Sequence, residues 1–90
     1  MSAEVMEIPA AARMAIHCIL HSAAVRALGR EFGGGLAVLH DSILDAMAQG
    51  GGVLPMSKGE RSVCRVLVGC DPFMFGGSAF VFDGEGVRNA

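Results

Sequence analysis

Residues 33–52 read GGGLAVLHDSILDAMAQGGG, so two glycine triplets enclose a short run rich in leucine, alanine and methionine. Glycine costs a helix about 1 kcal/mol relative to alanine and reaches positive φ without strain, so each triplet interrupts regular structure. Between the triplets, a helix would carry its large apolar side chains on one face and its polar ones opposite. The apolar set is Leu36, Leu39, Ile43 and Met47, and the polar set is Asp41, Ser42 and Asp45. The stretch predicts a helix over residues 36–49, capped by the second triplet.

The segment before the first triplet predicts a longer helix that begins at Pro9. Proline suits the first helical position, and most of the residues that follow are strong helix formers. The helix is expected over residues 9–32, or only as far as Leu28 if Gly29, which weakens the last turn, ends it. Only residues 33–35 separate the two predicted helices, which we therefore expect to fold back as an antiparallel pair.

The first helix has two apolar stripes when its residues are placed at 100° intervals. One stripe contains Ile16, Ile19, Leu20, Ala23 and Ala27. The second can be written as about three heptads, with Ala11, Cys18, Val25 and Phe32 at the a positions and Met14, His21 and Leu28 at the d positions. A helix with two apolar stripes must cover both, so we expect one to face the core of the chain and the other to face a partner chain.

The third segment, residues 53–90, is expected to be rich in strands. Residues 73–82 read FMFGGSAFVF, which predicts a hairpin whose two-residue turn is Gly76-Gly77. That register pairs Phe73 with Phe80 and places four aromatic rings on one face of the sheet. The four are Phe73, Phe75, Phe80 and Phe82. Such a face needs apolar cover, which the two helices supply.

Residues 58–70 are compatible with either a helix or a strand. The spacing of Ser57 and Glu60 is that of a capping box, which favours a helix. The alternation of Cys64, Val66 and Val68, together with the β-branched valines, favours a strand, and the strand is preferred. The predicted fold class is α+β, with an N-terminal antiparallel helical hairpin packed on a small C-terminal antiparallel β-sheet in one domain.

Composition predicts association with another protein chain. The 90 residues are 52% hydrophobic and only 18% charged, whereas a domain of this size buries only about 60 to 65% of its unfolded surface. Some of the apolar surface is thus expected in an interface, and a homodimer is the first expectation. The net charge is −2 and the seven basic residues are scattered, so nucleic acid is not an expected partner.

The same composition argues against membrane insertion and secretion. The apolar stretch at residues 8–28 is interrupted by Arg13, His17, His21 and Arg26, so it is not a typical spanning helix. The first residues carry Glu4 and Glu7 and lack the positive region of a signal peptide. Three cysteines without a C-x-x-C pair, Cys18, Cys64 and Cys70, are expected as buried thiols in a reducing compartment, so the predicted location is cytoplasmic.

His17 and His21 are the candidate metal ligands, because residues four apart on a helix can present two imidazoles to one ion. A third ligand such as His40 would be needed, and the glutamate of the H-E-x-x-H pattern is missing between them. The preferred interpretation is that His21 is a polar residue in the apolar stripe and that no metal or other cofactor is bound.

No complete catalytic constellation is visible, so the sequence predicts a non-enzymatic interaction module that self-associates through its first helix. One alternative is a small-ligand or metal-binding protein, or a minor enzyme subunit, that uses the histidines or a pocket beside the phenylalanines. Another is an inhibitor or adaptor that caps a larger macromolecular complex.

Overall fold

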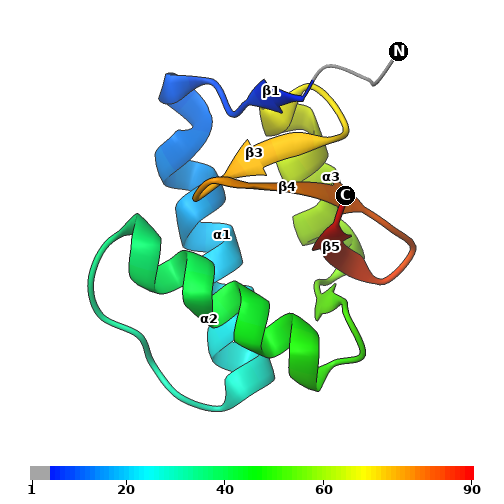
Figure 1. Cartoon of the computed structure of the whole chain (residues 1–90). Helices are drawn as coiled ribbons and strands as arrows, with labels where there is room; N and C mark the ends of the chain where they lie inside the picture. Colours follow the sequence, from blue (N-terminus) through cyan, green and yellow to red (C-terminus); the bar gives the residue numbers. More distant parts are fainter. Residues whose placement is uncertain (1–4) are drawn as a thin grey trace.

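A computed structural model describes residues 5–90, which form three helices and a small sheet (Figure 1). The helices are α1 (Ala10–Leu28), α2 (Leu36–Gln49) and α3 (Lys58–Val68). The strands are β1 (Met6–Glu7), β2 (Leu54–Pro55), β3 (Phe73–Phe75), β4 (Ser78–Phe82) and β5 (Gly86–Asn89), and they form one sheet in the order β1-β3-β4-β5-β2. The α+β class is confirmed.

The sheet is mixed, whereas the sequence predicted it to be antiparallel throughout. β1 runs parallel to β3, with Met6 opposite Phe73, and the other three strand pairs are antiparallel. β1 precedes α1 in the chain, so the sheet also recruits a strand from outside the third segment. A strand of two residues is too short to show the alternation that identifies strands in a sequence.

The glycines end both long helices as expected. α1 ends at Leu28, the earlier of the two predicted ends, because Gly29 adopts a left-handed conformation with φ 69° and donates its N–H to the carbonyl of Val25. Phe32 therefore lies in the loop beyond the helix. α2 covers the predicted residues and is followed by Gly50, whose N–H bonds the carbonyl of Ala46. α2 packs against α1, and the two helices cross in Figure 1.

The predicted hairpin is confirmed with its register. β3 and β4 are antiparallel with Phe73 opposite Phe80, and Gly76 and Gly77 both have positive φ in the turn. The four phenylalanines of these strands are all buried, and the rings of Phe73 and Phe82 stack with centroids 5.1 Å apart. The same buried cluster contains apolar residues from α1 and α2: Ile16, Leu20, Ala23, Leu39, Ile43 and Met47. The helices thus cover the aromatic face.

The preference for a strand over residues 58–70 is wrong, because Lys58–Val68 form α3. The capping box is present: the Ser57 hydroxyl accepts from the Glu60 N–H, and the Glu60 carboxylate accepts from the Ser57 N–H. Gly69 ends the helix in a left-handed conformation with φ 73°. These two signals at the ends prevail over the β-branched valines between them, whose propensities differ from those of other residues by only a few tenths of a kcal/mol each.

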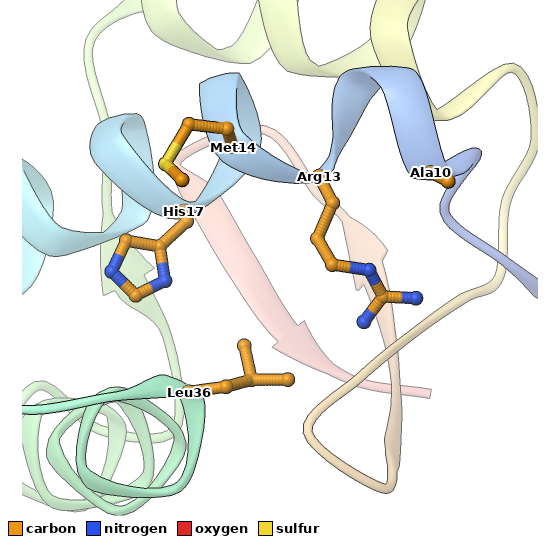
Figure 2. Close-up of a pocket in the computed structure, with 5 residues that line it drawn as sticks. All are labelled: Ala10, Arg13, Met14, His17 and Leu36. Atoms are coloured by element: carbon orange, nitrogen blue, oxygen red, sulfur yellow. The ribbon is translucent and has the colours of Figure 1, made fainter.

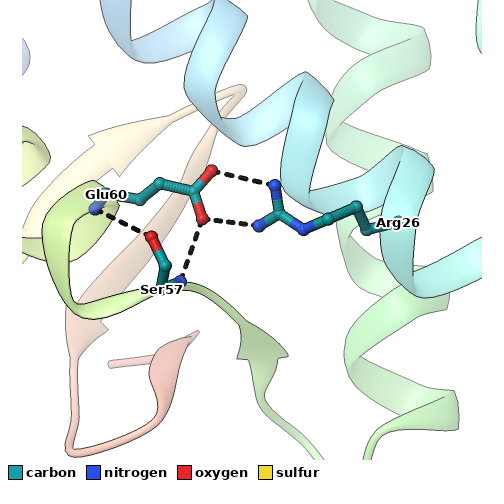
Figure 3. A network of polar contacts seen from close by, with 3 residues as sticks. All are labelled: Arg26, Ser57 and Glu60. Atoms are coloured by element: carbon teal, nitrogen blue, oxygen red, sulfur yellow. Dashed lines mark hydrogen bonds and ion pairs between the residues drawn. The ribbon is translucent and has the colours of Figure 1, made fainter.

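The capping carboxylate also ties α3 to α1 (Figure 3). Both terminal nitrogens of Arg26, on α1, donate to the two oxygens of Glu60, and the Nη1–Oε2 distance is 3.1 Å. Partial burial alone would raise the pKa of Glu60, but the hydrogen bonds from Arg26 and Ser57 outweigh it and hold the pKa below its ordinary value. One side chain therefore both caps a helix and joins two helices.

Acidification is expected to destabilise the protein through Glu60. The pKa of Glu60 is lower in the folded state than in the unfolded state. The stability that its charged carboxylate confers is therefore fully present above the unfolded-state pKa of about 4.3, and it is lost as the pH falls through the folded-state pKa. We expect the free energy of unfolding, measured by urea titration, to fall more steeply between pH 6 and pH 3 in the natural protein than in Glu60→Gln.

Glu60→Gln retains the cap, since glutamine also serves at this position, so at neutral pH it should cost only about 0.5–1 kcal/mol. Glu60→Ala removes the cap as well and should cost about 1–2 kcal/mol. Backbone N–H groups of Glu85 and Gly86 also lower the pKa of Asp83, but Asp83 is common to the natural protein and both variants. Equal pH slopes for the natural protein and Glu60→Gln would contradict the assignment.

Candidate functional site

The outer face of α1 is the most unusual surface of the described chain. It consists of Ala11, Met14, Ala15, Cys18, Ser22 and Val25, of which Val25 is half-buried and the others are exposed. Met14 is 72% exposed. Surface helices normally place charged residues opposite the core, yet this face carries none. Arg26 borders this face and is paired with Glu60, whereas Arg13 lies on the side of α1 toward Leu36 and is paired with Glu7.

The structure divides the predicted second stripe between two places. Ala11, Met14 and Cys18 lie on the exposed outer face, and Val25 lies at its end. His21, Leu28 and Phe32 are half-buried in contacts within the chain. This division follows from the end of α1 at Leu28, because the loop then folds Phe32 back over His21 instead of extending the helix.

The histidines have separate environments. His21 Nε2 lies 2.9 Å from the carbonyl of Phe32, and since a carbonyl only accepts, this nitrogen carries the proton and donates. The rings of His17 and His21 are parallel, with centroids 6.4 Å apart. His40, on α2, lies 2.8 Å from the Ser78 hydroxyl and packs on Phe80. Residues 5–90 bring together no group of three or more metal-ligating side chains.

A hollow of about 280 Å³ lies beside the outer face, between α1 and the start of α2. Ala10, Arg13, Met14, His17 and Leu36 line it, and Figure 2 shows Arg13 and His17 projecting from α1 toward Leu36. Two further hollows adjoin it. One, of about 430 Å³, shares Arg13 and Leu36 and reaches the turn of the β3–β4 hairpin. The other shares His17 and extends to Phe32.

The three cysteines differ in exposure. Cys64 is fully buried, and burial together with the nearby Glu60 carboxylate raises the pKa of its thiol to about 11. Cys70 is half-buried, and its thiol donates to the carbonyl of Pro72. Cys18 is exposed, so the expectation of a buried thiol is wrong there. It fails because Cys18 lies opposite the core stripe of α1, where nothing in the described chain covers it.

α3 also exposes an apolar and basic surface. Val66 is 81% exposed and Val63 50%. Lys58, Arg61 and Arg65 follow on the adjacent side of the helix, where they line a separate hollow. Arg65 is held by Asp71 and by the ring of Phe82, and Arg61 donates to the carbonyl of Asp83. These contacts give most of the local basic residues a structural role.

No protein-family model matches the chain, and comparisons with curated proteins and with solved structures find no similar protein. None of the helices in residues 5–90 meets the length and hydropathy that bilayer crossing requires.

Sequence reasoning located the outer face of α1 but missed the hollow beside it. Arg13 appeared only as an interruption of an apolar stretch, and Leu36 only as a residue of the core face of α2. The hollow forms because the loop after α1 folds back along the helix and places Leu36, the first residue of α2, beside Arg13 and His17. No local pattern encodes that return, since it depends on where two helices cross.

Proposed function

We propose that the protein is a non-enzymatic interaction module that self-associates through the outer face of α1. The observation that carries the proposal is the absence of any charged side chain on this face, from Ala11 to Val25, although most of it is exposed. An uncharged face brings no repulsion or costly desolvation of ions when two copies meet. Apolar area removed from water contributes about 25 cal/mol per Å².

The size of the side chains favours a helix as the occupant of this face. Ala11, Ala15, Cys18 and Ser22 are small, so a second helix could approach α1 at the short end of the usual range of about 8–10 Å between helix axes. Met14 is long and unbranched, and adapts to the partner surface. A second copy of α1 offers the same small residues, which makes the face complementary to itself in a two-fold dimer.

Replacing Cys18 by arginine is expected to convert a dimer to a monomer. The charge would enter the middle of the face, where burying it against a second copy costs several kcal/mol. Sedimentation velocity across a concentration series measures the change, and circular dichroism checks that helix content and melting are retained. The matched control is Ala27→Arg, an exposed position half a turn around the same helix, which should leave the dimer intact.

Cys18 also serves as a probe of the dimer. In an arrangement with its two-fold axis near the centre of the face, the two exposed thiols lie close together, so mild oxidation should yield a disulfide-linked dimer at low protein concentration. Cys18→Ser should abolish the cross-link but not the association. A natural protein that stays monomeric at every concentration, or a Cys18→Arg variant that remains dimeric, would refute the proposal.

A further inference from the structure

The hollow beside α1 combines apolar walls with two nitrogen-bearing side chains. Ala10, Met14 and Leu36 supply the apolar walls, and Arg13 and His17 are the polar groups among its lining residues. Both polar side chains project from α1 toward Leu36 (Figure 2). Their positions, four residues apart, place them on one side of the helix. A mainly apolar cavity with a few convergent polar groups is the usual form of a small-molecule site.

The charge of the hollow selects an anion. The guanidinium of Arg13 is always protonated, and its planar fork of donors matches the two oxygens of a carboxylate. His17 adds an imidazole ring N–H as a donor within the same lining. Within residues 5–90 the acidic side chain paired with Arg13 is Glu7, whose carboxylate is 3.9 Å from the guanidinium and 78% exposed. An exposed pair at that distance is weak, since such pairs contribute about 0–1 kcal/mol.

We propose that this hollow binds a small organic acid, with the carboxylate on Arg13 and the apolar body against Ala10, Met14 and Leu36. The volume of about 280 Å³ lies near the lower limit of ligand pockets, which restricts the ligand to a short aliphatic chain or a single ring. The adjoining hollow, which shares Arg13 and Leu36, leaves room for an acid with a longer aliphatic chain to extend toward the turn of the β3–β4 hairpin. The carboxylate of the acid displaces that of Glu7, which turns out to solvent.

Binding of an acid in this hollow does not depend on self-association of the protein. Arg13, Glu7, Ala10 and Leu36 lie off the outer face of α1, and Met14 alone is shared with it. The monomeric Cys18→Arg variant is therefore expected to bind the acid as well as the natural protein does. Failure of one proposal leaves the other testable.

The test is a titration with octanoate, followed by amide chemical shifts in two-dimensional NMR spectra, with octanamide and octylamine as controls of equal length. Octanoate should shift the amides of residues 10–17 and 36–38 in a saturable manner, and it should bind at least ten-fold more tightly than octanamide or octylamine. Equal binding of the acid, the amide and the amine would overturn the proposal, because it would show only an apolar surface.

Three variants locate the site. Arg13→Gln should weaken octanoate binding at least five-fold, whereas Glu7→Gln should strengthen it, because the competing carboxylate is gone. Ala10→Leu places a larger side chain in the hollow and should abolish binding. Because leucine is a good helix former, this variant should keep its helix content. An Arg13→Gln variant that binds octanoate as well as the natural protein, or a Glu7→Gln variant that binds it more weakly, would overturn the assignment of the carboxylate.

Discussion

Gly86→Ala is expected to be the most damaging single-methyl addition in the described chain. Gly86 is buried in β5 opposite Pro55 of β2, and a Cβ atom there would lie 1.9 Å from the carbonyl oxygen of Leu54. Backbone of a paired strand cannot yield by that much, so β2 has to separate from β5. We expect a loss of about 3 kcal/mol or more, out of a total that for 90 residues is about 5–13 kcal/mol.

Urea unfolding followed by circular dichroism measures this loss, and Gly84→Ala is the matched control. Gly84 lies two residues earlier in the β4–β5 turn, and a Cβ atom there meets nothing within 4 Å. That variant should remain within about 0.5 kcal/mol of the natural protein. If Gly86→Ala unfolded at the same urea concentration as Gly84→Ala, the pairing of β2 with β5 in this register would be wrong.

Elements whose local signals all agree could be predicted from the sequence. α2 lies between two glycine triplets, and the β3–β4 hairpin has its turn marked by Gly76-Gly77, so both appear with the expected bounds or register. In each case the apolar pattern inside the element agrees with the signals that bound it. Agreement between local signals is what makes such stretches predictable.

α3 shows how a prediction fails when local signals disagree. Its exposed valines, Val63 and Val66, favour a strand by propensity, whereas Ser57, Glu60 and Gly69 favour a helix by capping. The caps satisfy backbone groups that would otherwise be unpaired. The hydrogen bonds that Arg26 donates to Glu60 add a tertiary contact between residues far apart in the sequence. β1 and β2 were missed for a related reason, because each is a two-residue strand that exists only through its partner in the sheet.

The candidate site was only partly predictable. The helical period identified a second apolar stripe on α1, but it could not show that the stripe is exposed at Ala11, Met14 and Cys18 and half-buried at Leu28 and Phe32. That difference arises from Gly29, which ends the helix and returns the chain over one end of the stripe. The hollow at Arg13 depends on the same return.

Phe80→Ala is expected to cost about 3–5 kcal/mol, the range for removing a buried phenylalanine from a core. Phe80 is 1% exposed, and its ring packs edge-on against His40 of α2 and at 6.0 Å from the ring of Phe73. Truncation would leave a cavity where the hairpin meets α2. Thermal and urea unfolding both report the change.

Phe32→Ala makes the same truncation outside the sheet and serves as the control. Phe32 is half-buried in the loop after α1, so its loss should cost only about 1–2 kcal/mol. The double variant Phe73→Ala/Phe80→Ala should lose less than the sum of its single losses, because neighbouring truncations share one cavity and one set of lost contacts. Additive losses of unfolding free energy in the double variant, or equal losses for Phe80→Ala and Phe32→Ala, would contradict a continuous aromatic core beneath α1 and α2. That core supports the helix whose outer face is exposed.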